Sequence, residues 1–375
     1  LPAEEGLPDD GGGLTMPEMW INMGPQHPMT HGLWNLRIKV DGEVITDAMP
    51  EIGYLHRGME KIFENKTYTQ IGPITDRLCY GSSFTWNHLY CMTIENLMEL
   101  EIPERAKWIR VMAIEIQRIA SHLMWLAAYA ADLGLLTGFI WAMRDREIFV
   151  DLLQALSGSR LTYNYARIGG VAADLPPDFE RDCLRAVDYF ERKLKEHEKL
   201  YNGSKIFKMR AVGIGVLKRE DAINLGVTGP TLRGSNAKLD IRREQPYEVY
   251  DEIDFEVACH SDSDCWARYI VRMMEMRESC KIIRQALQKM PRGPVRVKTP
   301  MLAPSGDAIG VVEDPRGEGI MYVIGNGTEK PYRLKVRSPL FVILSAAKPM
   351  LLGYKVADVV SIMGSVDVCM GETDK

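Results

Sequence analysis

The sequence predicts an α+β fold: a helical-bundle core with β elements at its N- and C-terminal ends. Three observations favour this class. Residues 33–40 alternate apolar and polar side chains as a strand does, apolar residues recur at three- and four-residue steps through the middle of the chain, and residues 291–340 are punctuated by proline and glycine. Hydrophobic residues make up 46% of the 375, which is enough for a full core.

The N-terminal part begins with an acidic, Gly/Pro-rich stretch, and we expect residues 1–15 to form a flexible arm. A single domain is expected over residues 16–375. Its first part, residues 16–56, is β-rich, because Asp41-Gly42 separates the alternating stretch from Val44-Ile45 and indicates a hairpin.

The helical core is expected over residues 57–200. An apolar stripe at helical spacing runs from Ile109 to Leu123, and a second helix is expected over 178–200, where a run of charges is interpreted as a solvated face. His122, on the apolar helix face, is interpreted as a core histidine with a hydrogen-bond partner rather than as a ligand.

The rest of the chain is more irregular. Turn formers are frequent in residues 201–265, where we expect an irregular insertion with short strands. Residues 266–375 are expected to complete the domain with a helix over 266–290, then strands and loops, and a shorter helical pattern around Pro349.

One apolar stretch, from Ile119 to Met143, raises the question of a transmembrane helix, which needs about 20 apolar residues. Asp132 would then lie near the bilayer centre, where a carboxylate costs roughly 2.5–3.5 kcal/mol, and Gly134 and Gly138 weaken the helix further. We therefore expect a buried core segment. Because a buried carboxylate needs partners, Asp132 becomes a candidate site residue.

Charge and cysteine content exclude several classes of function. The net charge of −5 argues against a nucleic-acid partner. The seven cysteines include no Cys-x-x-Cys pair, which removes the usual signature of a zinc site or an iron–sulfur cluster held by this chain alone. Scattered thiols suit a reducing compartment, and no secretory signal is visible. Hydrolase chemistry has no support, because the sequence contains no Gly-x-Ser-x-Gly elbow.

A nonapeptide framed by glycine and proline, named here the histidine loop, is the most informative motif: Gly24-Pro25-Gln26-His27-Pro28-Met29-Thr30-His31-Gly32. Glycine lets the backbone approach a flat ligand closely, and proline stiffens the turn. The loop would place two imidazoles beside a cavity, where each can donate a hydrogen bond or a proton near neutral pH. The alternative interpretation is a surface turn with incidental histidines.

The histidine loop resembles the quinone-facing turn of the large hydrophilic subunit of respiratory complex I, the subunit that forms the quinone pocket. The resemblance continues in order along almost the whole chain, through Gly53–Lys61, Ile119–Leu123, Arg144–Glu147, Asn164–Gly170, Met276–Ser279 and Met370–Lys375. Chloroplast, cyanobacterial and archaeal relatives of this family use other electron donors, and the large subunits of nickel–iron hydrogenases are more distant kin. The resemblance implies a helical bundle like that of a hydrogenase large subunit.

The resemblance also implies quinone chemistry. Reducing a quinone takes two electrons and two protons, and a histidine and a tyrosine, with ordinary pKa values of about 6.5 and 10, suit the protonation. The family motif carries these roles onto His31 and Tyr80, with Asp132 matching the carboxylate that holds the histidine. The motif also places three further loop residues at the quinone cavity: His27, Thr30 and Gly32. For Tyr80 alone, the alternative is a packed core tyrosine.

A second set of residues matches positions near a partner's redox centre. Arg77 matches an arginine that lies against a 4Fe-4S cluster in the adjacent iron–sulfur subunit, where a guanidinium stabilises the reduced cluster. Many relatives carry a histidine two residues after the arginine that matches Arg160, whereas this chain has Thr162. That departure favours a low-potential acceptor, such as menaquinone, plastoquinone or a phenazine like methanophenazine, over ubiquinone.

The hydrogenase alternative can be examined in the same segments. A nickel–iron site needs four thiolates from two Cys-x-x-Cys pairs, but Ser82 replaces the second cysteine after Cys79, and Glu372 replaces the second after Cys369. Two thiolates remain where four are required, so we expect no metal at this position and no cofactor bound by this chain alone.

The sequence therefore predicts the quinone-cavity subunit of a membrane-bound, proton-translocating oxidoreductase, held peripherally at the cytoplasmic face of the cell membrane. Its partners would be the iron–sulfur subunit and further peripheral-arm and membrane-arm subunits. The donor stays open between NADH, ferredoxin and reduced coenzyme F420, and the tail and Thr162 favour an archaeal F420-linked enzyme. The alternatives are a non-catalytic scaffold and a residual nickel–iron hydrogenase large subunit.

Overall fold

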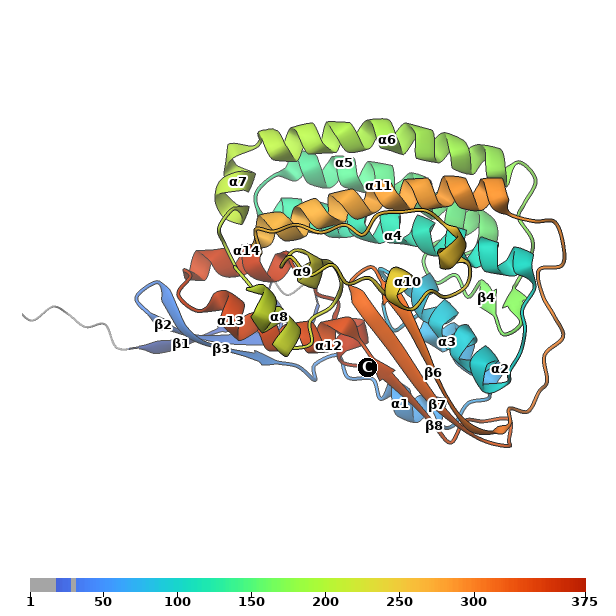
Figure 1. The fold of residues 1–375 in the computed structure, drawn as a ribbon. Coiled ribbons are helices and arrows are strands. Elements are labelled where there is room, and N and C mark those ends of the chain that lie inside the picture. The colour runs from blue at the N-terminus through green and yellow to red at the C-terminus, as the bar shows by residue number, and fades with distance from the viewer. Residues whose placement is uncertain (1–17, 28–31) are drawn as a thin grey trace, which may run out of the picture.

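The computed structural model describes residues 18–27 and 32–375. The middle of the chain forms long helices in the upper part of the view, and small antiparallel sheets from the two ends of the chain lie below them (Figure 1), so the predicted α+β class is confirmed. The expected flexible arm, residues 1–15, lies outside the described residues.

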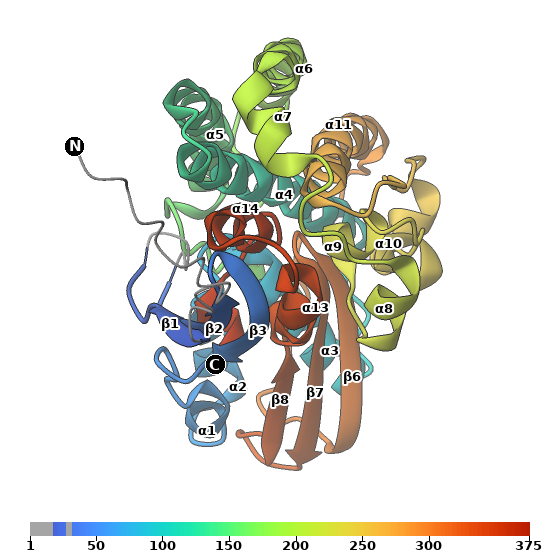
Figure 2. The same ribbon diagram turned by 90° about the vertical axis from the view of Figure 1, so that its left-hand side faces the viewer.

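The N-terminal sheet is a three-stranded antiparallel meander of β1 (Met19–Met23), β2 (Asn35–Asp41) and β3 (Val44–Glu51). The predicted hairpin is confirmed by β2 and β3. The sheet packs beside the C-terminal helices (Figure 2), and Ile45 N donates to Tyr354 O at 2.9 Å. The strands that frame the histidine loop are therefore anchored to the end of the chain.

The helical core is built around one long central helix. Four long helices run side by side (Figure 1): α4 (Glu104–Asp132), α5 (Leu136–Ser157), α6 (Phe179–Gly203) and α11 (Cys265–Lys289). Three shorter helices precede them: α1 (Met59–Phe63), α2 (Tyr68–Thr75) and α3 (Ser83–Leu97). The charged helix α6 buries one apolar stripe and exposes its charges, as expected.

The apolar stretch from Ile119 to Met143 is divided between two helices, which corrects the expectation of one buried segment. The helix α4 ends at Asp132, and Gly134, with φ +80°, lies in the turn before α5. Asp132 is consequently half-buried and not buried. Across residues 18–27 and 32–375, every helix is too short or too polar to cross a membrane.

The stretch 201–265 contains short helices, and the prediction of short strands there was wrong. After β4 (Ala166–Arg167), β5 (Gly170–Val171) and α6, the chain forms α7 (Lys205–Ala211), α8 (Arg219–Asn224), α9 (Gly229–Arg233), α10 (Ile241–Glu244) and η2 (Tyr250–Glu252). Two polar residues in this stretch are helix caps: Ser204 accepts from Phe207 N, and Asp240 accepts from Arg242 N.

The C-terminal sheet is a second antiparallel meander, and α3 packs against it. Its strands are β6 (Ser305–Asp314), β7 (Gly317–Asn326) and β8 (Arg333–Arg337). The chain then forms α12 (Pro339–Ile343), η3 (Leu344–Ala346), α13 (Ala347–Leu351), η4 (Val356–Asp358), α14 (Val359–Gly364) and α15 (Met370–Thr373). The buried end of the chain thus returns to the middle of the molecule.

Candidate functional site

The C-terminal segment joins two parts of the molecule that are distant in sequence. The Sγ atom of Cys369 lies 3.1 Å from the Sγ atom of Cys79, just before α3. The carboxylate of Asp374 accepts the backbone N–H groups of Gly53 at 2.7 Å and Leu55 at 2.8 Å, just after β3. The tail therefore connects the end of the N-terminal sheet to the turn between α2 and α3.

That turn, residues 76–82, is named here the tyrosine turn. Within the turn, Leu78 and Cys79 are completely buried, whereas 52% of the surface of Tyr80 is exposed. The alternative of a packed core tyrosine is therefore wrong. Gln117 of α4 donates to Gly81 O at 2.8 Å and supports the turn from below. Desolvation by the surrounding protein raises the pKa of Tyr80, so its hydroxyl keeps its proton at neutral pH.

The histidine loop leaves β1 through a glycine that no other residue can replace. Gly24 has φ +127°, and a Cβ there would overlap the backbone oxygen of the buried Trp34. His27 is half-buried and Gly32 is exposed. Two predicted site residues, Thr30 and His31, lie outside the described residues.

Asp132 lies beside the end of α14, close to where the C-terminal tail begins. A Cβ on Gly364 would be 3.5 Å from Asp132 Oδ2, and Trp125 donates from its indole nitrogen to Gly364 O at 2.8 Å. Asp132 therefore lies beside the same C-terminal segment that contacts the tyrosine turn. Its pairing with His31 stays a prediction.

Two hydrogen bonds join the tyrosine turn and the first residue of α3 to the segment that contains Arg160 and Thr162. Asn164 N donates to the Asp76 carboxyl at 2.6 Å, and Ser83 Oγ donates to Leu161 O at 2.6 Å. Burial raises the pKa of Asp76 to about 7. The structure thus brings together the two segments that the sequence assigned to the partner's cluster.

The predicted cluster-facing residues are accessible there. The side chains of Arg77 and Arg160 are each about half-exposed, and Thr162 is half-buried. Arg77 donates to Pro73 O, and Arg160 pairs with Glu147. Neither guanidinium is enclosed, so both can meet a neighbouring surface.

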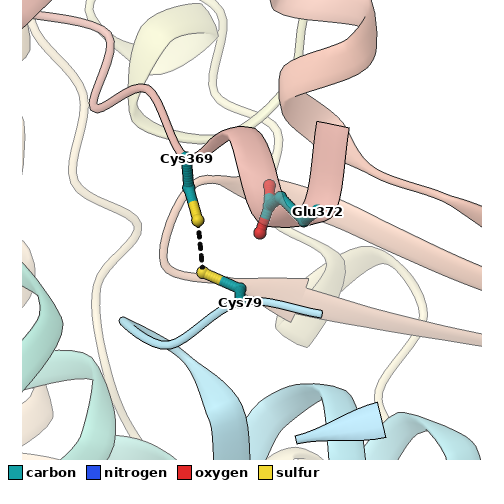
Figure 3. A group of neighbouring side chains, drawn as sticks. All are labelled: Cys79, Cys369 and Glu372. Atoms are coloured by element: carbon teal, nitrogen blue, oxygen red, sulfur yellow. Dashed lines mark hydrogen bonds between the residues drawn. The ribbon is translucent and has the colours of Figure 1, made fainter. Parts of the chain in front are cut away.

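The tyrosine turn and the C-terminal segment together form a group of three potential metal ligands: Cys79, Cys369 and Glu372 (Figure 3). One ligand atom from each lies within 4.8 Å of the others, and all three side chains are buried. Burial raises the pKa of the Cys79 thiol and of the Glu372 carboxyl well above their ordinary values. The sequence identified all three positions and predicted no metal.

Two buried residues support this group: Arg316, which the sequence reasoning missed, and Asp367, two residues before Cys369. Arg316 is buried in the turn between β6 and β7 and donates to Asp367 Oδ1 at 3.1 Å. An added Cβ on Gly81 would lie 2.9 Å from Arg316, so this guanidinium packs directly under the tyrosine turn. Arg316 belongs to no motif that could have marked it, whereas Asp367 lies in the segment of Cys369 and Glu372 that resembles a paired-cysteine motif.

A second, larger group of buried charges lies between the long helices and the C-terminal sheet. Arg233 pairs with Glu275 at 2.7 Å and with Glu313 at 2.8 Å, and Arg242 pairs with Glu115 at 3.1 Å. We name this group the ionic core and define it by its buried charged members: Glu95, Arg110, Glu115, Arg233, Arg242, Glu248, Glu275 and Glu313.

His122 is a core histidine within this region, as expected. Its Nε2 atom lies 2.8 Å from Glu275 Oε2, and its side chain is completely buried. Burial lowers the pKa of His122, which favours the neutral ring.

Comparison with known proteins identifies the family. A family profile described as "Respiratory-chain NADH dehydrogenase, 49 Kd subunit" matches residues 132–305 and 297–375. Three bacterial relatives, all named as one and the same subunit of NADH-quinone oxidoreductase, are similar over nearly their whole length. The protein of Desulforamulus reducens is 46% identical over 95% of this chain and 98% of its own. The protein of Geobacillus kaustophilus is 45% identical over 96% of this chain and 99% of its own. The protein of Dehalococcoides mccartyi is 47% identical over 95% of this chain and 98% of its own.

The similarity extends beyond the profile into the N-terminal part, which carries the histidine loop and the tyrosine turn. Both segments therefore come from the same ancestral chain as the rest of the fold. The chain belongs to the family of the 49 kDa subunit of respiratory NADH dehydrogenase, the NADH-quinone oxidoreductase also called complex I.

Proposed function

We propose that this chain forms much of the quinone-binding cavity of a membrane-associated NADH-quinone oxidoreductase. Relatives at 45–47% identity carry that enzyme's name, which supports NADH as the donor. The expectation of an archaeal F420-linked enzyme gains no support from these bacterial relatives. The complex would sit at the cytoplasmic face of the membrane and couple quinone reduction to proton translocation.

The observation that carries this proposal is the position of Tyr80. Its phenol is half-exposed and protonated, yet it stands on a turn whose neighbours are completely buried and hydrogen-bonded. Such a group is rigidly held and free to contact a ligand, which is what a positioned proton donor requires.

In the proposed mechanism, the Tyr80 hydroxyl donates a hydrogen bond to one quinone carbonyl and then transfers its proton. The imidazole of His31 would act at the other carbonyl, and the carboxylate of Asp132 would favour its charged form. The remaining loop residues would line the cavity: His27, Thr30 and Gly32. The resulting change of charge at Asp132 would bias the membrane arm toward proton pumping.

The electrons would come from a 4Fe-4S cluster in an adjacent iron–sulfur subunit that closes the cavity. Arg77 and Arg160 offer that subunit two accessible guanidinium groups from hydrogen-bonded neighbouring segments. Thr162 in this surface favours a low-potential quinone, such as menaquinone, over ubiquinone. Further peripheral-arm and membrane-arm subunits would hold the assembly at the membrane.

The substitution Tyr80→Phe tests the proposal, since it removes one hydroxyl and keeps the ring. In the assembled complex, we expect quinone reduction to fall on the order of 100-fold, the loss typical for a positioned proton donor. The matched control is Tyr332→Phe, because Tyr332 is 67% exposed and far along the chain; it should leave turnover unchanged. Near-normal turnover in a fully assembled Tyr80→Phe complex would favour a non-catalytic scaffold.

A further inference from the structure

We propose that Cys79, Cys369 and Glu372 form a binding site for one thiophilic divalent cation, such as Zn²⁺. Figure 3 shows the two sulfurs facing each other and the Glu372 carboxylate beside them. The three ligands come from two distant segments, the tyrosine turn and the chain around α15. A bound cation would therefore tie the C-terminal segment to the turn that carries Tyr80. This inference does not depend on quinone chemistry.

The distances suit such an ion after a small movement. Zinc binds thiolate sulfur at about 2.3 Å and carboxylate oxygen at about 2.0–2.2 Å, in tetrahedral geometry. Two sulfurs on one tetrahedral zinc are therefore roughly 3.8 Å apart. The sulfurs of Cys79 and Cys369 are 3.1 Å apart, so the distance between them must increase by roughly 0.7 Å.

The carboxylate of Glu372 is already oriented by two donors. Trp86 donates from its indole nitrogen to Oε2 at 3.2 Å, and Ser338 donates from its hydroxyl to Oε1 at 2.9 Å. Each oxygen keeps further lone pairs for a cation. Hydrogen bonds of this kind fix ligand orientation in metal sites and contribute to affinity.

Charged groups of both signs surround the three ligands. The buried guanidinium of Arg316 is close by, but Asp367 pairs with it at 3.1 Å. A further buried carboxyl, Asp314, acts electrostatically on both Cys79 and Glu372. In the described part of the chain, Oδ1 of Asp314 and Oδ2 of Asp367 have no hydrogen-bond partner. Arg118 and Arg272 also act on these carboxyls, so the negative charge that a dication requires would come mainly from the ligands themselves, the two thiolates and Glu372.

The donor set distinguishes this site from a nickel–iron centre, which requires four thiolates. Two thiolate sulfurs and one carboxylate oxygen instead suit a single closed-shell ion such as Zn²⁺, which binds both kinds of ligand in proteins. A disulfide is the rival structure, and it would require the sulfurs to approach each other to about 2.0 Å.

The experiment uses the full-length chain, reduced and stripped of metal, and titrates it with cadmium chloride as a probe. We expect one cadmium ion per chain, a thiolate-to-cadmium absorption band in the ultraviolet, and protection of Cys79 and Cys369 from alkylation. Zinc chloride should compete for the same site. A folded, reduced chain that binds no cadmium would overturn the proposal, as would a Cys79–Cys369 disulfide that persists under reducing conditions.

Matched variants locate the site. Cys79→Ser and Cys369→Ser should each abolish the stoichiometric absorption band, and Glu372→Gln, which keeps the shape of the side chain, should weaken binding at least tenfold. Trp86→Phe, which removes one donor to Glu372, should weaken it about 10- to 100-fold.

The control is Cys183→Ser, because Cys183 is equally buried but lies on α6. Unchanged cadmium affinity in the Cys79, Cys369 and Glu372 variants would place the ion elsewhere and contradict the assignment. Because the readout is metal binding and not turnover, this result is independent of the Tyr80→Phe test.

Discussion

The ionic core and the tyrosine turn handle charged and polar groups in opposite ways. In the ionic core, Arg233 and its partners Glu275 and Glu313 are buried and paired with each other. In the tyrosine turn, Tyr80 and Arg77 stand half-exposed on a backbone that is itself enclosed. The first arrangement can only hold the fold together, whereas the second leaves its groups free to act on another molecule.

The difference has an energetic side. Removing charges from water is costly, and a buried ion pair often stabilises a protein no more than apolar residues of similar size would. The ionic core instead fixes how elements lie relative to one another, because its side chains connect α9, α10 and β6 to the long helices α4 and α11. The ionic core is therefore a frame that joins elements distant in sequence.

The largest expected effect comes from breaking the frame at Arg233. In Arg233→Met, Glu275 and Glu313 lose their shared cation while remaining buried, so the free energy of unfolding should fall by about 3–5 kcal/mol. Denaturant unfolding of the full-length chain measures this loss. The control is Arg284→Met, since Arg284 pairs with Asp188 at the surface, and its loss should cost at most about 1 kcal/mol. Similar losses for the two variants would show that burial of the pair is irrelevant.

A second prediction concerns acid. Burial opposes ionisation of Glu248, but the Arg110 guanidinium and His88 hold the pKa of its carboxyl at about 2, below the ordinary 4.5. The folded state therefore binds fewer protons than the unfolded state, and the associated stability is complete above pH 4.5 and is lost as the pH falls toward 2. It amounts to about 3 kcal/mol, since each pH unit corresponds to roughly 1.4 kcal/mol.

The measurement compares the unfolding free energies of wild type and Glu248→Gln between pH 7 and pH 3. The gap between the two proteins should be widest near neutral pH and should narrow below pH 4.5. A gap that is constant with pH would mean that Glu248 gains nothing from being ionised in the folded state.

A smaller effect is expected at the tyrosine turn. Arg77→Met should leave the stability of the chain nearly unchanged, because the guanidinium is half-exposed. In the assembled complex, it should lower the midpoint potential of the partner's cluster by about 60 mV, equivalent to roughly 1.4 kcal/mol of lost charge stabilisation. Redox titration followed by electron paramagnetic resonance measures the shift. Arg185→Met, on the exposed side of α6, should not move the midpoint, and an unmoved midpoint in Arg77→Met would separate Arg77 from the cluster.

Much of the fold could be predicted from the sequence. The helix expected over 266–290 is α11, Cys265–Lys289, because its apolar residues recur at helical spacing. The hairpin of β2 and β3 followed from alternation around Asp41-Gly42. Local patterns of this kind report which face of an element is buried, and they are visible in any window of the chain.

The ionic core could not be predicted in the same way. Arg233 lies in a stretch that reads as turns, and its partners Glu275 and Glu313 are 42 and 80 residues away. An ion pair formed across such a separation leaves no local pattern. The contact between Cys79 and Cys369, 290 residues apart, was likewise not visible from spacing; only the resemblance to paired cysteine motifs linked the two positions.

We propose that the tyrosine turn holds Tyr80 in position to protonate a quinone. A structure of the assembled complex with a bound quinone would show whether it does. We predict the Tyr80 hydroxyl within about 3 Å of one carbonyl oxygen of the headgroup, with the His31 ring at the opposite carbonyl. A headgroup bound elsewhere, with Tyr80 covered by a neighbouring subunit, would show that Tyr80 is not the proton donor.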